Sequence, residues 1–145
     1  NTVNNIEQVS KDRLYRNSDL ISLHVPLNMD TSEMITKNEM SKMRKGALLV
    51  NTSRGGIINE TDLYNALISG HLAAAAVDVF EQEPYSGPLS SVEQCLLTAH
   101  MGSMSVDCRS RMECESAEEV ARFVSGETLM HQVPEEEYQN QEQGL

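Results

Sequence analysis

Aromatic and basic residues are scarce in this chain of 145 residues. It contains no Trp, and only 4% of its residues are aromatic, so a core has to be built from aliphatic side chains and the eight Met. Lys and Arg number 11 against 22 Asp and Glu, which gives a formal net charge of -11. Nucleic acids and anionic membranes both attract clustered Lys and Arg. We therefore expect neither as a partner.

Long apolar segments and clustered metal ligands are missing as well. The longest uninterrupted apolar run, residues 72–77, is far shorter than the roughly 20 residues that cross a bilayer. Cys95, Cys108 and Cys114 form no C-x-x-C pair, and the four His do not cluster with them. We expect no disulfide framework and no metal site, and a reducing cytoplasm is the predicted compartment.

Short apolar runs alternate with helical patterns along the chain. Thr36 and Glu39 form a capping box, and Gly70 and Gly126 follow two further helical patterns. The patterns predict helices over 11–17, 36–45, 59–69 and 105–124, and strands over 20–25, 47–50, 73–79 and 95–98. This alternation is typical of an α/β fold with a parallel sheet of about four strands, flanked by helices. Continuously apolar strands indicate a sheet covered on both faces.

The composition changes toward the end of the chain. From residue 113 to residue 145 there are nine Glu against one Arg. We predict one domain over residues 1–126 and an acidic tail over 127–145, with residues 134–145 solvated or mobile. A binding role for the tail is the alternative.

The residues that could bind a ligand or take part in catalysis follow the carboxyl ends of the predicted strands. In open parallel sheets, ligands bind outside these ends. The segments in question are His24-Val25-Pro26, residues 51–56, residues 78–84, and Ala99-His100.

Three of these residues form a candidate catalytic set. Arg54 precedes two glycines and suits a carboxylate, although a surface ion pair is the alternative. Glu83 precedes Pro84, and Glu81 is the competing carboxylate. His100 is a candidate acid or base, with a purely structural histidine as the alternative. Together they suggest that Arg54 binds a ligand carboxylate, that Glu83 orients the histidine, and that His100 acts as a base.

Four segments resemble one known family. SDLISLHVPLNMDT, MRKGALLVNTSRGGIINETDLYNAL, GHLAAAAVDVFEQEP and LLTAHMGS occur in that order between residues 18 and 103. They resemble the NAD-dependent D-2-hydroxyacid dehydrogenases, a group that includes enzymes similar to phosphoglycerate dehydrogenase. The resemblance extends over residues 10 to 126 and implies the second half of a Rossmann-type sheet.

The resemblance implies a hydride transfer between a small 2-hydroxy or 2-oxo acid and NAD, with NADP not excluded. It assigns Arg54 to the substrate carboxylate and carbonyl oxygen, His100 to acid-base catalysis, and Glu83 to support of that histidine. The residues expected to contact the cofactor are His24, Val25, Pro26, Ser53 and Asp78, the last through the nicotinamide amide.

Two departures from the family pattern stand out. Ala99 occupies a position where the family usually has Pro, and the sequence contains no G-x-G-x-x-G turn. We therefore expect part of a longer protein or the product of a truncated gene. Such a chain would be inactive alone, and its first strand would have an unpaired edge. That edge predicts a homo-oligomer or pairing with a missing N-terminal half. The alternative function is a non-catalytic remnant that acts as a binding or interaction module.

Overall fold

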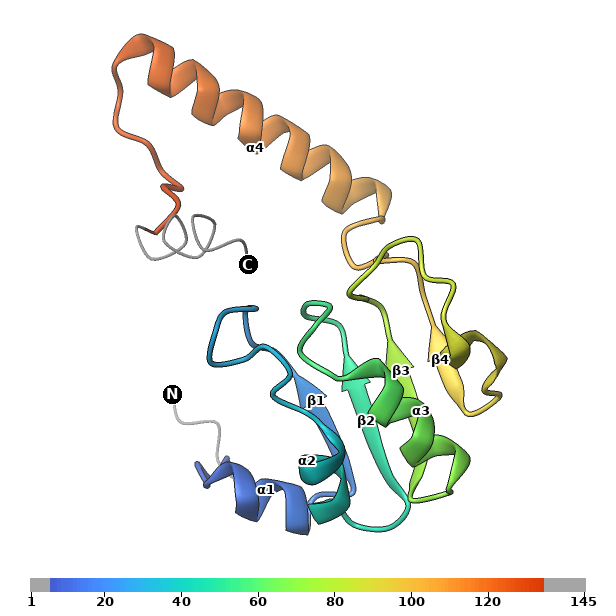
Figure 1. Cartoon of the computed structure of the whole chain (residues 1–145). Helices are drawn as coiled ribbons and strands as arrows, with labels where there is room; N and C mark the ends of the chain where they lie inside the picture. Colours follow the sequence, from blue (N-terminus) through green and yellow to red (C-terminus); the bar gives the residue numbers. More distant parts are fainter. Residues whose placement is uncertain (1–5, 135–145) are drawn as a thin grey trace. The chain divides into compact units, whose positions relative to one another are not determined.

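The computed structural model describes residues 6–134, and the chain divides into two compact units between Ala99 and His100. The first unit contains the sheet, and the second contains one long helix (Figure 1). In chain order the elements are α1 (Lys11–Asn17), β1 (Leu20–Leu23), α2 (Lys37–Lys42), β2 (Ala47–Asn51), α3 (Glu60–Ile68), β3 (Leu72–Val77), the 3-10 helix η1 (Pro88–Ser91), β4 (Cys95–Leu97) and α4 (Val106–Ser125).

The sheet has four parallel strands in the order β1-β2-β3-β4. Leu23 pairs with Asn51, Asn51 with Val77, and Val77 with Leu97, so all four strands end at one level. The prediction of an α/β fold with about four parallel strands is confirmed. The third strand begins one residue earlier than predicted and ends at Val77 instead of residue 79.

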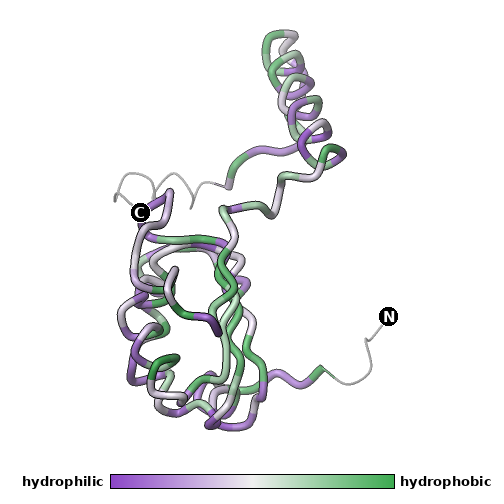
Figure 2. Tube along the Cα trace, turned by 90° about the vertical axis from the view of Figure 1, so that its right-hand side faces the viewer, coloured by the Kyte–Doolittle hydropathy of each residue, from purple (hydrophilic) through white to green (hydrophobic). Residues whose placement is uncertain are grey.

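The three α-helices of the first unit lie on one face of the sheet (Figure 2). On that face Ile21, Leu49 and Leu72 are buried, and they pack with Met40 and Leu63 from the helices. A fully buried side chain of this size stabilises the fold by roughly 1.5–3 kcal/mol. Alternate strand residues are exposed, among them Leu20, Leu48 and Leu96. Within residues 6–99, the expectation of strands covered on both faces is therefore wrong.

Side-chain caps begin the helices where the sequence predicts them. Thr36 and Glu39 form the capping box of α2, and Asn59 caps α3 by accepting a hydrogen bond from the Asp62 N–H. The end of α2 differs from the prediction, because the helix stops at Lys42 and not at residue 45. Met43 takes an extended backbone that buries its side chain in the core. Apolar burial thus overrides the helical preference of the basic residues that follow.

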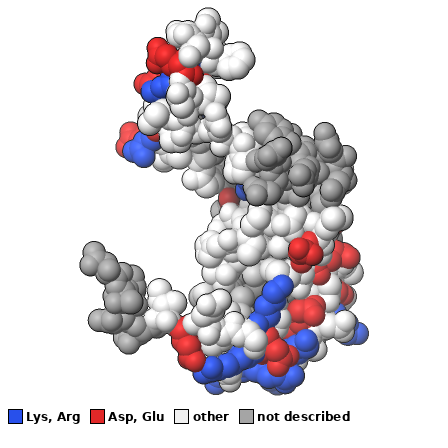
Figure 3. All heavy atoms as spheres, turned by 90° about the vertical axis from the view of Figure 1, so that its left-hand side faces the viewer, with Lys and Arg blue, Asp and Glu red and all other residues white. Residues whose placement is uncertain are grey.

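Basic side chains gather toward one end of the first unit (Figure 3). Arg13 pairs with Glu7 at 2.7 Å, Arg16 with Asp12 at 2.8 Å, and Arg44 with Asp19 at 2.7 Å. Asp19 precedes β1 and Arg44 precedes β2, so this cluster lies at the amino ends of the strands. The pairs are exposed, so water and salt screen them and each contributes little to stability.

The second unit is built around α4. Ser105 caps its start, and Gly126 ends it in the left-handed region with φ of 70°. Arg122 donates to Glu119 at 2.6 Å, and the same carboxylate accepts from the Met130 and His131 N–H groups. Over residues 6–134, every helix is too short or too polar to cross a membrane. Of the predicted solvated segment 134–145, all but Pro134 lies outside the described residues.

The three cysteines have different surroundings, and these predict different reactivities. Burial raises the pKa of the Cys95 thiol on β4 to about 11, whereas Cys114 on α4 is exposed. Since a folded-state pKa above the unfolded value favours the protonated thiol, Cys95 stabilises the fold below its unfolded pKa. That contribution is lost as the pH rises toward 11.

We expect an aromatic disulfide reagent at pH 8 to modify Cys114 first and Cys95 last, because the thiolate is the nucleophile. Stopped-flow absorbance measures the phases. The fastest phase should vanish in Cys114→Ser and persist in Cys95→Ser. A fastest phase that disappears with Cys95→Ser would show that the thiol is not held protonated.

Candidate functional site

The carboxyl edge of the sheet brings together four residues that directly follow the strands. Given the register, His24, Thr52, Asp78 and Thr98 each stand one residue beyond the paired positions at the strand ends. Polar side chains from four separate stretches of sequence therefore occupy one edge of the first unit. This is the edge where parallel α/β sheets bind ligands.

The loop after β1 is braced by its own hydrogen bonds. The Pro26 carbonyl accepts from the Thr31 hydroxyl at 2.6 Å, and the Asn28 side chain accepts from the Thr31 N–H at 3.1 Å. Val25 packs against the core. His24 is exposed, and its Nε2 lies 2.8 Å from the Ser22 hydroxyl. The bracing fixes the direction in which the chain leaves β1.

Asn51 organises the loop that carries Ser53 and Arg54. Its Oδ1 accepts from the Ser53 N–H at 3.1 Å and from the Ser53 hydroxyl at 2.8 Å, and its Nδ2 donates to the Arg54 carbonyl at 2.9 Å. Its backbone carbonyl accepts from the Asp78 N–H at 2.9 Å. The side chain is 2% exposed, so this polar residue at the end of an apolar strand is buried with its hydrogen bonds made.

Arg54 is exposed, and its guanidinium Nη1 donates to the Ser53 carbonyl at 2.7 Å. In the sequence it is the only Lys or Arg between Lys45 and Arg109. The other cations of the first unit precede residue 46, and several of them pair at the amino ends of the strands. Arg54 thus supplies the positive charge among the loops at the carboxyl edge.

Backbone contact joins the Arg54 loop to the segment after β3. A Cβ atom at position 55 would lie 1.9 Å from the Phe80 carbonyl oxygen and 2.7 Å from the Glu81 nitrogen. Only glycine allows two backbones to approach this closely. The RGG sequence therefore has a steric explanation, and Arg54 is held beside the segment that leads to Glu83.

Glu83 lies in a loop whose backbone N–H groups donate to two carboxylates, those of Glu83 itself and Glu60. Its Oε1 accepts from the Phe80 N–H at 3.0 Å, and the Glu83–Pro84 peptide is cis. The competing Glu81 instead uses its backbone N–H, which donates to Glu60 Oε1 at 2.9 Å. Burial raises the pKa of Glu60; the hydrogen bond from the Glu81 N–H opposes this rise, and the Glu81 charge adds to it. The loop is thereby attached to the first turn of α3.

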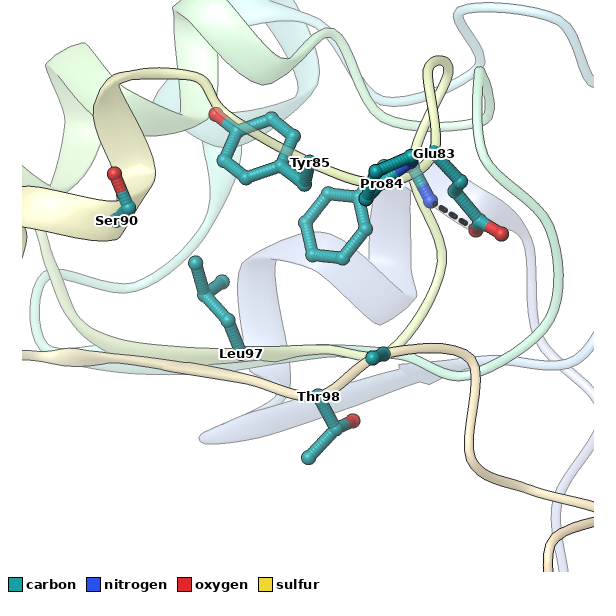
Figure 4. Close-up of a pocket in the computed structure, with 8 residues that line it drawn as sticks. Glu83, Pro84, Tyr85, Ser90, Leu97 and Thr98 are labelled. Atoms are coloured by element: carbon teal, nitrogen blue, oxygen red, sulfur yellow. Dashed lines mark hydrogen bonds between the residues drawn. The ribbon is translucent and has the colours of Figure 1, made fainter.

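A hollow of about 580 Å³ adjoins Glu83 (Figure 4). The rings of Phe80 and Tyr85 stack on one side of it with centroids 4.3 Å apart. In the figure the Glu83 carboxylate points away from Tyr85 and Ser90. The hollow is lined by Phe80, Glu83, Pro84, Tyr85, Ser90, Leu97, Thr98 and Ala99.

Asp78 and His100 stand in different units. Asp78 is 7% exposed, and its Oδ1 accepts from the Thr98 hydroxyl. His100 begins the second unit; it is exposed and has a φ of 52°, which is uncommon for a residue with a side chain. The first unit brings Ser53, Arg54 and Asp78 into one connected arrangement, and His100 belongs to the second unit. Among residues 6–134, no group of three or more His, Cys, Asp or Glu is arranged to hold a metal ion.

Sequence reasoning missed two residues of this arrangement, Asn51 and Thr98. From the sequence, Asn51 is expected only within the segment 51–56 at the carboxyl edge, and Thr98 only at the end of a predicted strand, without a role for either side chain. The sequence does carry a signal for Asn51: its amide side chain can both donate and accept hydrogen bonds, and it stands between an apolar strand and a loop that contains glycines.

Comparison with known proteins identifies the family. The model of the D-isomer specific 2-hydroxyacid dehydrogenase NAD binding domain matches residues 1–102, and the chain belongs to this family. The resemblance found in the sequence is thus confirmed. The family model describes an NAD-binding domain, which agrees with NAD as the expected cofactor.

The similar proteins are longer than this chain. It is 43% identical over 124 residues to a glyoxylate reductase of Korarchaeum cryptofilum, covering 84% of this chain and 37% of that protein. A glyoxylate reductase structure from Paecilomyes thermophila matches with a TM-score of 0.82 and 38% identity, covering 88% and 39%. An NAD-dependent formate dehydrogenase from Staphylococcus aureus in complex with NAD matches with a TM-score of 0.79 and 34% identity, covering 84% and 38%. The chain spans about two fifths of their length.

The close approach of Gly55 to Phe80 predicts that adding one methyl group at position 55 lowers the free energy of unfolding by a large amount. We expect Gly55→Ala to destabilise the chain by at least about 3 kcal/mol, because the two loops have to separate. Urea unfolding followed by circular dichroism measures the loss. Gly70→Ala is the matched control. Its φ is 68°, and an added Cβ would meet no atom within 4 Å beyond its chain neighbours, so only backbone strain of about 1 kcal/mol is expected. Equal losses in the two variants would contradict the close approach.

Proposed function

We propose that this chain forms the catalytic half of an NAD-dependent dehydrogenase acting on small D-2-hydroxy acids and the corresponding 2-oxo acids. The supporting observation is the carboxyl edge, where one cation, Arg54, is fixed by Asn51 and Gly55 beside the loop of Glu83. Membership of the family supports the same reaction class.

In the proposed reaction, Arg54 binds the substrate carboxylate. A guanidinium offers a fork of N–H donors that matches a carboxylate and stays charged at any physiological pH. The hydrogen bond from its Nη1 to the Ser53 carbonyl has to be exchanged for the substrate, and the Asn51 amide keeps the backbone in place meanwhile. A second contact to the 2-oxo oxygen would polarise the carbonyl.

We propose that His100 exchanges the proton of the substrate hydroxyl. In the oxidation of a hydroxy acid, the imidazole takes this proton; in the reduction of an oxo acid, it returns a proton to the alkoxide oxygen. A carboxylate that accepts the other ring N–H favours the charged imidazolium and selects one tautomer. We assign that role to Glu83, whose Phe80 hydrogen bond orients its side chain.

The first unit contains groups suited to a nicotinamide dinucleotide. Asp78 places a buried carboxylate at the end of β3, and a nicotinamide amide has N–H groups to donate to it. His24, Val25, Pro26 and Ser53 come from the two neighbouring strand ends at the same edge. When bound, the nicotinamide ring supplies the hydride acceptor or donor. We propose NAD, and NADP is included in the test.

The sequence contains no G-x-G-x-x-G turn, which in dinucleotide-binding folds lets a helix N-terminus approach the pyrophosphate. We therefore expect the 145-residue chain alone to turn over no substrate with either cofactor. When the chain replaces the matching segment of the Korarchaeum cryptofilum glyoxylate reductase, we expect glyoxylate reduction, measured through the absorbance of the reduced nicotinamide. In that hybrid, His100→Ala and Arg54→Ala should each lower kcat/KM by about 100-fold or more.

Arg44→Ala provides the matched control, since Arg44 pairs with Asp19 at the amino ends of the strands. It should leave kcat/KM unchanged. An active hybrid that keeps its rate after His100→Ala would refute the catalytic assignment, and an inactive hybrid would favour an interaction module. Turnover by the isolated chain, lost in His100→Ala, would overturn the expected need for further segments.

A further inference from the structure

One side chain at the carboxyl edge has a partner but no role in the proposed function. The Thr98 hydroxyl donates to Asp78 Oδ1, and the Thr98 N–H donates to the Val77 carbonyl at 3.1 Å. The hydroxyl of the residue after β4 thereby reaches the carboxylate of the residue after β3. Both contacts lie within the first unit, and they follow from the pairing of Val77 with Leu97.

The Thr98 hydroxyl does not point toward the residues on the far side of the hollow beside Glu83 (Figure 4). In Figure 4 the Thr98 side chain points to the side of its strand opposite Leu97, away from Tyr85 and Ser90. Thr98 is exposed, so its side chain also adds little to the core. Its distinguishing interaction is the hydrogen bond to Asp78.

A hydroxyl donor on a buried carboxylate has two physical effects. It offsets part of the cost of removing the negative charge from water. It also restricts rotation about the bond to the carboxyl group, which is otherwise a broad torsion. Asp78 is 7% exposed, so both effects apply at this position.

We propose that Thr98 is a positioning residue that sets the orientation of the Asp78 carboxylate toward the nicotinamide amide. This inference rests on the proposed function, in which Asp78 holds that amide. Thr98 touches Asp78 and acts through it. Its consequence is selectivity: the hydroxyl strengthens recognition of an amide N–H and leaves other parts of the dinucleotide unaffected.

The test compares two dinucleotides on the 145-residue chain. Reduced NAD carries the amide, and reduced 3-acetylpyridine adenine dinucleotide has a methyl ketone without N–H donors. NMR titration of the ¹⁵N-labelled chain at millimolar ligand measures both dissociation constants. Thr98→Val replaces the hydroxyl by a methyl group of similar size, Thr98→Ser retains the hydroxyl, and Asp78→Asn removes the charge.

We expect Thr98→Val to weaken binding of reduced NAD by about tenfold, the effect of one hydrogen bond to a charged group. Binding of the acetylpyridine analogue should change by less than about twofold. Thr98→Ser should keep the wild-type preference for the amide, and Asp78→Asn should lose it.

The outcomes separate this inference from the function on which it rests. If Asp78→Asn abolishes the preference and Thr98→Val retains it, the role of Thr98 is overturned and the proposed cofactor contact stands. Equal weakening of both ligands by Thr98→Val, with a lower melting temperature, would show a structural role and would also overturn it. If Asp78→Asn keeps the preference, or the wild-type chain binds neither dinucleotide, the proposed cofactor contact itself fails.

Discussion

The close approach of Gly55 to the Phe80 carbonyl is the constraint on which the carboxyl edge depends. A side chain at position 55 would overlap backbone atoms of the next loop, so the two loops lie together only because one residue has no Cβ. Through this contact the segment that presents Arg54 is set beside the segment that leads to Glu83. Neither loop has regular structure of its own, and each is fixed by the other.

Hydrogen bonds at the strand ends extend this constraint across the sheet. The Asn51 amide holds the Ser53 and Arg54 backbone, its carbonyl accepts from the Asp78 N–H, and the Asp78 carboxylate accepts from Thr98. Buried hydrogen bonds of this kind are costly to leave unmade, about 1–3 kcal/mol for each abandoned group. Hydrogen bonds therefore connect the ends of β2, β3 and β4.

The sequence was sufficient to predict the element order, the parallel sheet and the family, because each depends on patterns within a few residues. The capping box at Thr36 and the glycine at position 126 are local signals of this kind, and both caps form as expected. Where tertiary packing decides, the prediction was wrong. Burial of Met43 ends α2 early, and residues such as Leu96 remain exposed on one face of the sheet.

The residues of the candidate site likewise fall into those that the sequence could predict and those that it could not. Arg54, Glu83 and Asp78 were singled out from their positions after apolar runs, and the structure describes their surroundings. Asn51 and Thr98, which hold Arg54 and Asp78 in place, received no role from the sequence. The Asn51 side chain makes local hydrogen bonds, whereas its backbone bond to Asp78 and the Thr98–Asp78 bond depend on the register of neighbouring strands, which is a property of the folded sheet. The roles of these residues in a reaction stay predictions.

A map of where a dinucleotide touches this chain tests the central claim, that the carboxyl edge of the sheet is the cofactor site. Chemical shift changes of backbone amides on addition of reduced NAD provide that map. The account predicts the largest changes at residues 24–25, 53–54, 78 and 98. Changes centred instead on the groove between α2 and α3, lined in part by Lys37, Asp62 and His71, would contradict it.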